Sequence, residues 1–226
     1  MATRPRMETI QHERRDLISG LTIELKQRIL ECLPTRDAAR MAMLSTLWKN
    51  VWLQHGQLVF DEDFFQSIQN YVAENSTSVV NIINNILLLR RGPVKKFTLN
   101  INIKPMLQQS DVERWCSFLS RNGIEELTLH LFVLRSMLKL PICIFSCPTI
   151  KRLKLDSLIV DFPANAPCIF PGVTSLVFDN SITYALEMNI LRELACFPRA
   201  SPNAQLVFLE HESTYNLVGY NVIDEY

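Results

Sequence analysis

The first fifty residues combine helical periodicity with a large apolar surface. Between residues 16 and 52, apolar side chains recur three and four positions apart, as on one face of an α-helix. Pro34 ends a first helix, and Thr35 is a good N-cap for the next, with Asp37 in its first turn. The pattern predicts two or three short helices with these apolar residues: Leu25, Ile29, Leu30, Leu33, Leu44, Trp48 and Trp52. About forty residues cannot bury such a surface alone, so it packs on the rest of the chain or on another protein.

A second helical stretch follows. Residues 79–89 are apolar apart from three Asn, and they predict a buried helix of about half the roughly 20 residues that a membrane span requires. Arg90 and Arg91 fall in its last turn, where cations suit the helix dipole, and Gly92 with Pro93 ends it. We therefore expect a helical linker that joins the two halves of the chain rigidly.

Beyond Gly92 the hydrophobic period changes from helical spacing to alternation. An apolar residue, two polar ones and then Leu-x-Leu recur at residues 94–99, 124–129, 150–155 and 173–178, with a poorer copy at 204–209. The fourth positions of these copies, 97, 127, 153, 176 and 207, are separated by 30, 26, 23 and 31 residues. These spacings are close to the roughly 20–29 residues of leucine-rich repeats. Each copy predicts a short strand.

The segment between the first two copies predicts how the strands are connected. Ser110 and Glu113 have the spacing of a capping box, an apolar helical face follows, and Asn122 with Gly123 closes the helix. A strand, helix, strand unit makes neighbouring strands parallel, and stacked units form a solenoid with helices on the convex side. The later connection at residues 140–148 is shorter and predicts turns or single helical turns.

Polar residues alternate with the leucines and therefore face the concave side of the predicted sheet. These candidate target-binding residues are Lys96, Thr98, Glu126, Thr128, His130, Arg152, Lys154 and Asp156. Cations and carboxylates are balanced among them, which argues against a polyanion partner and fits a protein surface read by mixed polar contacts. A solvated sheet face that binds nothing has the same composition.

Composition and charge narrow the class of protein further. The 226 residues are 48% apolar and 20% charged, enough for a buried core, and 23 basic residues balance 23 acidic ones. Without a global field, we expect neither nucleic acid nor a membrane as partner. The four Arg within residues 4–15 have no apolar stretch beside them, so we expect no secretory signal and residence in the nucleus, the cytoplasm or both.

The residue types that carry catalysis are sparse. The six Cys include no CxxC pair, and the four His lack metal-ligand spacing, so we expect reduced thiols, no metal site and no cofactor. The six Gly form no phosphate-binding motif, and neither GxSxG nor HExxH occurs. We expect a protein that is not an enzyme.

The N-terminal segment resembles the plant-type F-box. Its sequence DLISGLTIELKQRILECLPTRDAARMAMLSTLWKNVW follows the family's order of D-x-I-S-x-L-P, I-L-x-x-L-P-T-K-D-A and L-S-x-x-W-x-x-x-W. The resemblance implies docking to a Skp-family adaptor, and through it to a cullin, by Leu21, Ile29, Leu30, Leu33, Leu44, Trp48 and Trp52. Leu25 is expected to pack internally. Two positions depart from the family: Thr22 replaces a Pro, and Leu47 replaces a common basic residue.

The second half is similar to the repeat region of plant F-box/LRR and F-box/FBD/LRR proteins. The phrases DVERWCSFLSRNGIEELTL and LPICIFSCPTIKRLKL carry this similarity. Family members continue for more repeats, so a member truncated after about five repeats is expected.

Together the patterns predict a mixed α+β or α/β fold in four parts. These are a flexible tail (1–15), a three-helix F-box (16–54), a helical linker (55–92) and an irregular leucine-rich-repeat arc with a parallel sheet (93–226). The implied function is substrate recognition in an SCF-type E3 ubiquitin ligase, with the repeats binding an unknown target protein. The alternative is a non-ligase, repeat-based scaffold or decoy whose F-box is degenerate at Thr22 and Leu47.

Overall fold

Three short helices form a module at one end of the molecule. The computed structural model describes residues 18, 20–75, 78–101, 107–132, 137–163, 169–179, 182–183 and 205–209, and the statements below concern these residues. The helices of this module, which we call the helical module, are α1 (Ile23–Glu31), α2 (Thr35–Met41) and α3 (Thr46–Gln54). Ser45 caps α3 by accepting a hydrogen bond from the Trp48 amide at 3.2 Å. The three predicted helices are confirmed.

The role expected for Thr35 is corrected. The N-cap of α2 is Pro34, and Thr35 is the first residue of the helix. Its hydroxyl oxygen instead accepts a hydrogen bond from the amide of Val59, 2.8 Å away, in the strand β1 (Gln57–Phe60). This strand lies in the segment expected to be a helical linker. It has only four residues, which show too little alternation to stand out in the sequence.

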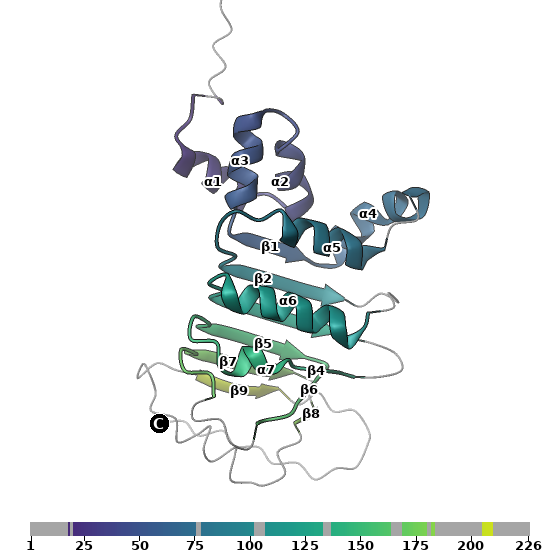
Figure 1. Cartoon of the computed structure of the whole chain (residues 1–226), viewed down its shortest axis with the longest axis vertical. Coiled ribbons are helices and arrows are strands. Elements are labelled where there is room, and N and C mark those ends of the chain that lie inside the picture. The colour runs from purple at the N-terminus through teal and green to yellow at the C-terminus, as the bar shows by residue number, and fades with distance from the viewer. Residues whose placement is uncertain are drawn as a thin grey trace, which may run out of the picture.

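A six-stranded parallel sheet forms the body of the molecule, in the order β1-β2-β3-β5-β7-β9 (Figure 1). Strand order follows chain order, as a solenoid requires. The remaining strands of this sheet are β2 (Lys96–Ile101), β3 (Glu126–Leu131), β5 (Arg152–Asp156), β7 (Ser175–Asp179) and β9 (Gln205–Leu209). Leu99, Leu129, Leu155 and Phe178 are register partners from strand to strand, which confirms the predicted apolar column under parallel strands.

The fifth copy of the repeat is shifted by one residue from its expected register. Leu206 pairs with Leu176, and Phe208 pairs with Phe178, so position 206 rather than 207 matches the fourth position of the other copies. A shift of one residue exchanges the two faces of a strand. Residues 206–209 are all apolar, and alternation along the chain therefore does not fix the register.

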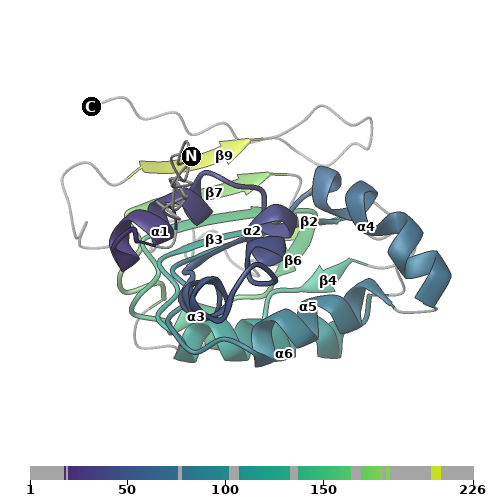
Figure 2. The ribbon, with the colours of Figure 1, turned by 90° about the horizontal axis from the view of Figure 1, so that it is seen from above.

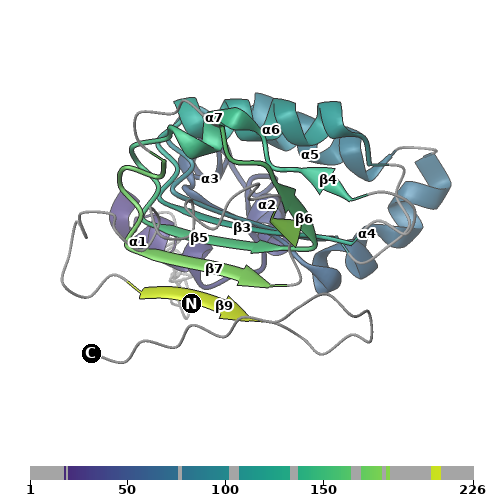
Figure 3. The same cartoon turned by 90° about the horizontal axis from the view of Figure 1, so that it is seen from below.

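Helices cover one face of the sheet and leave the other open. Figure 3 shows α5 (Val79–Leu88), α6 (Gln109–Arg121) and α7 (Ile142–Phe145) along the same side of the strands, whereas α4 (Glu62–Asn75) extends from the end near β1. The indole nitrogen of Trp115 in α6 donates a 2.7 Å hydrogen bond to the amide oxygen of Asn84 in α5. One of the three Asn of the apolar stretch therefore joins two neighbouring helices.

Two expectations about the connections have different outcomes. Helix α6 begins earlier than the sequence predicted, because its capping box pairs Gln108 with Asp111, whose carboxylate accepts from the Gln108 amide at 3.2 Å. The expected box of Ser110 and Glu113 is therefore wrong, whereas Gly123 at φ +72° closes the helix as predicted. The four residues of α7 confirm a single helical turn in the later connection.

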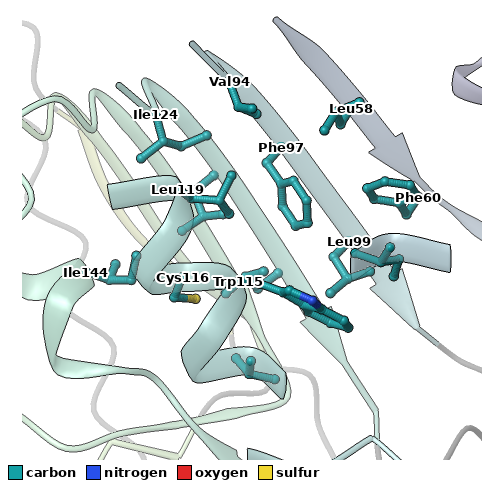
Figure 4. Packing of buried hydrophobic residues seen from close by; sticks show 14 of the residues in the cluster. Leu58, Phe60, Val94, Phe97, Leu99, Trp115, Cys116, Leu119, Ile124 and Ile144 are labelled. Carbon is teal, nitrogen blue, oxygen red and sulfur yellow. The ribbon is translucent and has the colours of Figure 1, made fainter. Parts of the chain in front are cut away.

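A second, three-stranded parallel sheet is built from short strands that alternate along the chain with β3, β5, β7 and β9 of the first. Its strands are β4 (Leu138–Lys139), β6 (Leu158–Val160) and β8 (Ile182–Thr183). Seen from above in Figure 2, the helical module lies over the β1 end of the larger sheet. One continuous apolar cluster runs from Leu30 in the module to Phe178 in β7. Trp115 and Leu119 of α6 lie beside Phe97 and Leu99 of β2 within it, whereas Cys116 lies nearer Ile144 of α7 (Figure 4).

Candidate functional site

The seven residues expected to dock an adaptor differ in exposure. Leu44 is 67% exposed, and Leu21, Ile29 and Leu33 are partly buried. Leu30, Trp48 and Trp52 are only 0%, 3% and 6% exposed, because they lie in the core that the module shares with the sheet. The expectation that these three present a docking surface is corrected, and they support the module from inside.

Helix α1 is rotated relative to the expected face. Leu25, expected inside, is 51% exposed, whereas Lys26 is buried. The ammonium of Lys26 donates a 2.6 Å hydrogen bond to the Leu21 carbonyl, so its aliphatic stem can pack inside while its charge is satisfied. Because Lys26 and Leu30 are one helical turn apart, this contact turns Leu25 outward.

The module exposes six large apolar side chains, which we call the exposed apolar set. Three of them belong to α1 and the segment before it, and three to the connection between α2 and α3 and the first turn of α3. They are Ile18, Ile23, Leu25, Met43, Leu44 and Leu47. The residues expected to dock an adaptor include only Leu44 of this set, although Met43 is adjacent to it and Leu47 lies three positions further along the chain. Exposed apolar residues gathered in one small module indicate a binding surface.

The open face of the large sheet carries rows of polar side chains in register. Arg152 forms an ion pair with Glu126 across β3 and β5. His130 is hydrogen-bonded through Nδ1 to the carboxylate of Asp156, which also accepts a 3.0 Å bond from the Ser157 hydroxyl. Asp156 is only 7% exposed, so its carboxylate orients His130. All eight predicted concave residues lie in β2, β3 and β5, in adjacent register positions.

Among the described residues, some charged side chains on and beside this face form ion pairs and others do not. Within the described residues no ion pair involves Lys96 or Lys154, which lie in the first and second of the three rows of concave residues. At the neighbouring rim, Glu125 pairs with Lys151 at 2.6 Å and with Lys95 at 3.8 Å. The hydrogen bond and charge of Lys151 hold the pKa of Glu125 below its usual range. Thr98 and Thr128 add hydroxyls beside these charges, which suits mixed polar contacts.

The described residues offer no metal centre, and burial affects two of their thiols. No group of three or more His, Cys, Asp or Glu in this part of the chain could hold a metal ion. Burial raises the pKa of the Cys116 and Cys143 thiols, so both remain protonated at neutral pH. Cys168 and Cys196 lie outside the described residues. None of the described helices is long and apolar enough to cross a membrane.

Comparison with known proteins identifies the helical module. Residues 18–58 match the family model of the F-box domain. An F-box/FBD/LRR-repeat protein of Arabidopsis thaliana is 38% identical over 140 residues, which are 62% of this chain and 32% of the relative. Two F-box/LRR-repeat proteins of the same plant are 32% identical over 144 residues and 27% identical over 189 residues, covering 36% and 50% of their own lengths. No solved structure matches.

The chain therefore carries an F-box domain, and its stacked parallel strands have the arrangement of a leucine-rich-repeat solenoid. The resemblance to plant F-box/LRR-repeat proteins is confirmed. The chain spans about a third to a half of the length of the curated relatives it matches. F-box domains generally bind Skp-family adaptors, and F-box/LRR proteins generally are non-catalytic adaptors.

Proposed function

We propose that this chain is a substrate-recognition subunit of an SCF-type E3 ubiquitin ligase. Its F-box would dock a Skp-family adaptor and, through it, a cullin, while the open face of the sheet binds a target protein. The chain itself catalyses nothing. It acts by proximity, since a target held near a charged conjugating enzyme presents its lysines at high effective concentration. We place this activity in the nucleus, the cytoplasm or both.

The observation that carries the proposal is the exposed apolar set within the matched F-box segment. Met43 and Leu44 are 85% and 67% exposed, and they lie at the connection between α2 and α3. Burial of one such side chain at an interface contributes about 1.5–3 kcal/mol relative to exposure in water. A surface of this kind favours an apolar partner groove, whereas a module that only supported the sheet would gain nothing from exposing it.

On the target side, we propose that the three rows of concave residues bind the target protein. Lys96 and Lys154 offer charges, Thr98 and Thr128 offer hydroxyls, and Glu126 with Arg152 offers an ion pair that a partner can reorganise. Asp156 would act indirectly by orienting His130.

The docking proposal is tested by titrating the chain with a purified plant Skp-family adaptor in a calorimeter. The test variant is the double substitution Met43→Asp and Leu44→Asp, which leaves the buried Leu30, Trp48 and Trp52 intact. We expect micromolar or tighter binding by the parent chain, with a negative heat-capacity change, and a loss of at least about tenfold in the variant.

A matched control uses the adjacent pair Leu88 and Leu89 at the end of α5. These side chains are 79% and 60% exposed and lie outside the matched F-box segment, so their double substitution to Asp changes charge and exposure by similar amounts. Adaptor binding should survive this change. If the folded parent chain does not bind the adaptor at all, the ligase proposal fails and the non-ligase scaffold or decoy is favoured.

A further inference from the structure

One charged side chain joins the F-box to the repeat sheet. Arg90 follows α5, and its guanidinium reaches the end of α3 in the F-box. Its Nη1 donates hydrogen bonds to the carbonyl of Trp52 at 2.7 Å and to that of His55 at 3.4 Å, while Nε donates to the Ile86 carbonyl of its own helix at 3.2 Å. The guanidinium carbon also lies 4.2 Å from the centroid of the Trp52 ring.

The Arg90 contacts compensate a buried positive charge. Burial lowers the pKa of Arg90 to about 10, which keeps the guanidinium protonated at neutral pH. The carbonyls at the C-terminal end of α3 carry the negative end of the helix dipole, and the face of the Trp52 ring attracts cations. Nη2 is buried and has no hydrogen-bond partner among the described residues.

An apolar side chain would fill the same space without burying a charge. Met, for example, has a similar length and loses little on desolvation. Met does not, however, form oriented hydrogen bonds. A planar guanidinium bonds carbonyls and stacks on a ring in one orientation only. The feature that distinguishes Arg90 from an apolar filler is therefore a fixed geometry between α3 and α5.

Backbone hydrogen bonds next to Arg90 also connect the F-box to the segment that enters β2. The Arg91 amide donates to the Leu53 carbonyl at 2.8 Å, and the amides of Lys95 and Lys96 donate to the Gly56 carbonyl at 2.8 and 3.0 Å. On the other side of the F-box, the hydrogen bond from Val59 to Thr35 ties α2 to the edge strand β1. The module is thus attached at two separate places, which restricts its rotation against the sheet.

We infer that Arg90 is a positioning residue, which fixes the orientation of the adaptor-binding F-box relative to the target-binding face of the sheet. The inference rests on the proposed function for its biological meaning, since orientation determines where a bound target stands relative to the conjugating enzyme. The geometry itself can be measured in the free chain.

The experiment measures the distance between the two ends of the protein by pulsed electron spin resonance. Spin labels are attached through a noncanonical amino acid, which avoids the native thiols, at Met43 of the F-box and at Lys154 of β5. Both positions are exposed. A second pair of labels at Glu113 and Lys154 lies entirely within the repeat half and reports whether the sheet and α6 remain intact.

The parent chain is compared with Arg90→Met and with the neighbouring control Arg91→Met. The Arg91 side chain is exposed, and the recorded link from this residue uses its backbone amide only. We expect Arg90→Met to broaden the distribution between positions 43 and 154 and to leave the one between 113 and 154 unchanged. Arg91→Met should reproduce both parent distributions. An Arg90→Met chain with the parent's distribution between 43 and 154 overturns the inference.

Two further measurements separate orientation from folding and from docking. If Arg90→Met does not fold, Arg90→Lys replaces it, since Lys retains the charge but lacks the planar fork, and it should broaden the same distribution. Arg90→Met should retain the parent's adaptor affinity, because Arg90 does not belong to the exposed apolar set. Weaker adaptor binding with an unchanged distance would contradict the inference. Absence of adaptor binding by the parent would contradict the proposed function only.

Discussion

At the scale of single residues, His55 at the end of the F-box makes the stability of the folded chain depend on pH. It follows α3, is only 4% exposed, and stacks on Trp52 with 5.8 Å between ring centroids. Burial, and secondly the positive charge of Arg90, lower the pKa of His55 from 6.5 to about 4. The folded chain therefore holds a neutral imidazole at pH values where an unfolded chain binds a proton.

The expected consequence is a loss of stability in mild acid. Because the folded pKa lies below the unfolded one, the contribution of His55 is complete above about pH 6.5 and declines as the pH falls toward 4. We expect a loss of about 1–2 kcal/mol relative to a His55→Gln chain, after allowing for solvent screening. Urea unfolding of both chains at several pH values measures it. Parallel stability curves for the two chains would contradict the assignment.

The sequence predicted whether a side chain is buried where a hydrophobic pattern is repeated. It did not predict this where a single tertiary contact determines the burial. The leucines of β2, β3 and β5 point inward, as their alternation predicted. Leu25, expected to pack internally, is exposed, whereas Lys26 is buried and donates a hydrogen bond to a carbonyl five residues earlier in the chain. Trp48 and Trp52 match the F-box pattern, but the sequence does not show that both are buried in an apolar cluster that continues into the sheet.

At the scale of elements, Thr35 protects the outer edge of β1. An edge strand presents unpaired amides, and the threonine hydroxyl accepts from one of them at 2.8 Å in a position only 5% exposed. Replacement by Val preserves the shape but leaves the Val59 amide without its acceptor. We expect Thr35→Val to lower the free energy of unfolding by about 1–3 kcal/mol, as for a buried unsatisfied donor.

The control for this element is Thr35→Ser, which retains the acceptor and removes one methyl group. Its loss should be smaller than that of Thr35→Val in urea unfolding. Equal losses would assign the role of Thr35 to packing of its methyl group, and the edge of β1 would not depend on the hydrogen bond.

Elements were predictable to the extent that several of their residues obey one period. Helices α1 to α3 and strands β2, β3, β5 and β7 have enough periodic positions to be identified. Strand β1 has four residues and the register of β9 is hidden by consecutive apolar residues, so both are determined by pairing with a neighbouring strand. The candidate site follows the same rule, since register predicted the concave rows but not which exposed side chains surround the α2 to α3 connection.

At the scale of the whole molecule, the F-box and the repeat sheet share one apolar core, although the hydrophobic period of the sequence differs between them. The sequence predicted boundaries after residues 54 and 92, yet one apolar cluster includes Leu30 and Trp52 of the F-box together with Phe60, Phe97 and residues further along the sheet. Helix α2 contacts both β1 and α4. Because the F-box covers the first strand, it does for this sheet what a terminal cap does for a repeat array.

A shared core and a two-point attachment imply that the F-box and the first repeats unfold together. Native-state hydrogen exchange of the unmodified chain measures opening of α3 and of β3 separately as denaturant is added. We expect their opening free energies to converge on one value with one denaturant dependence, because opening α3 exposes the core that β2 and β3 share. In Arg90→Met the protection of α3 should fall below that of β3. A lower opening free energy for α3 than for β3 in the parent chain would contradict this expectation. The F-box and the repeats would then unfold independently, and Arg90 would orient them without making their unfolding cooperative.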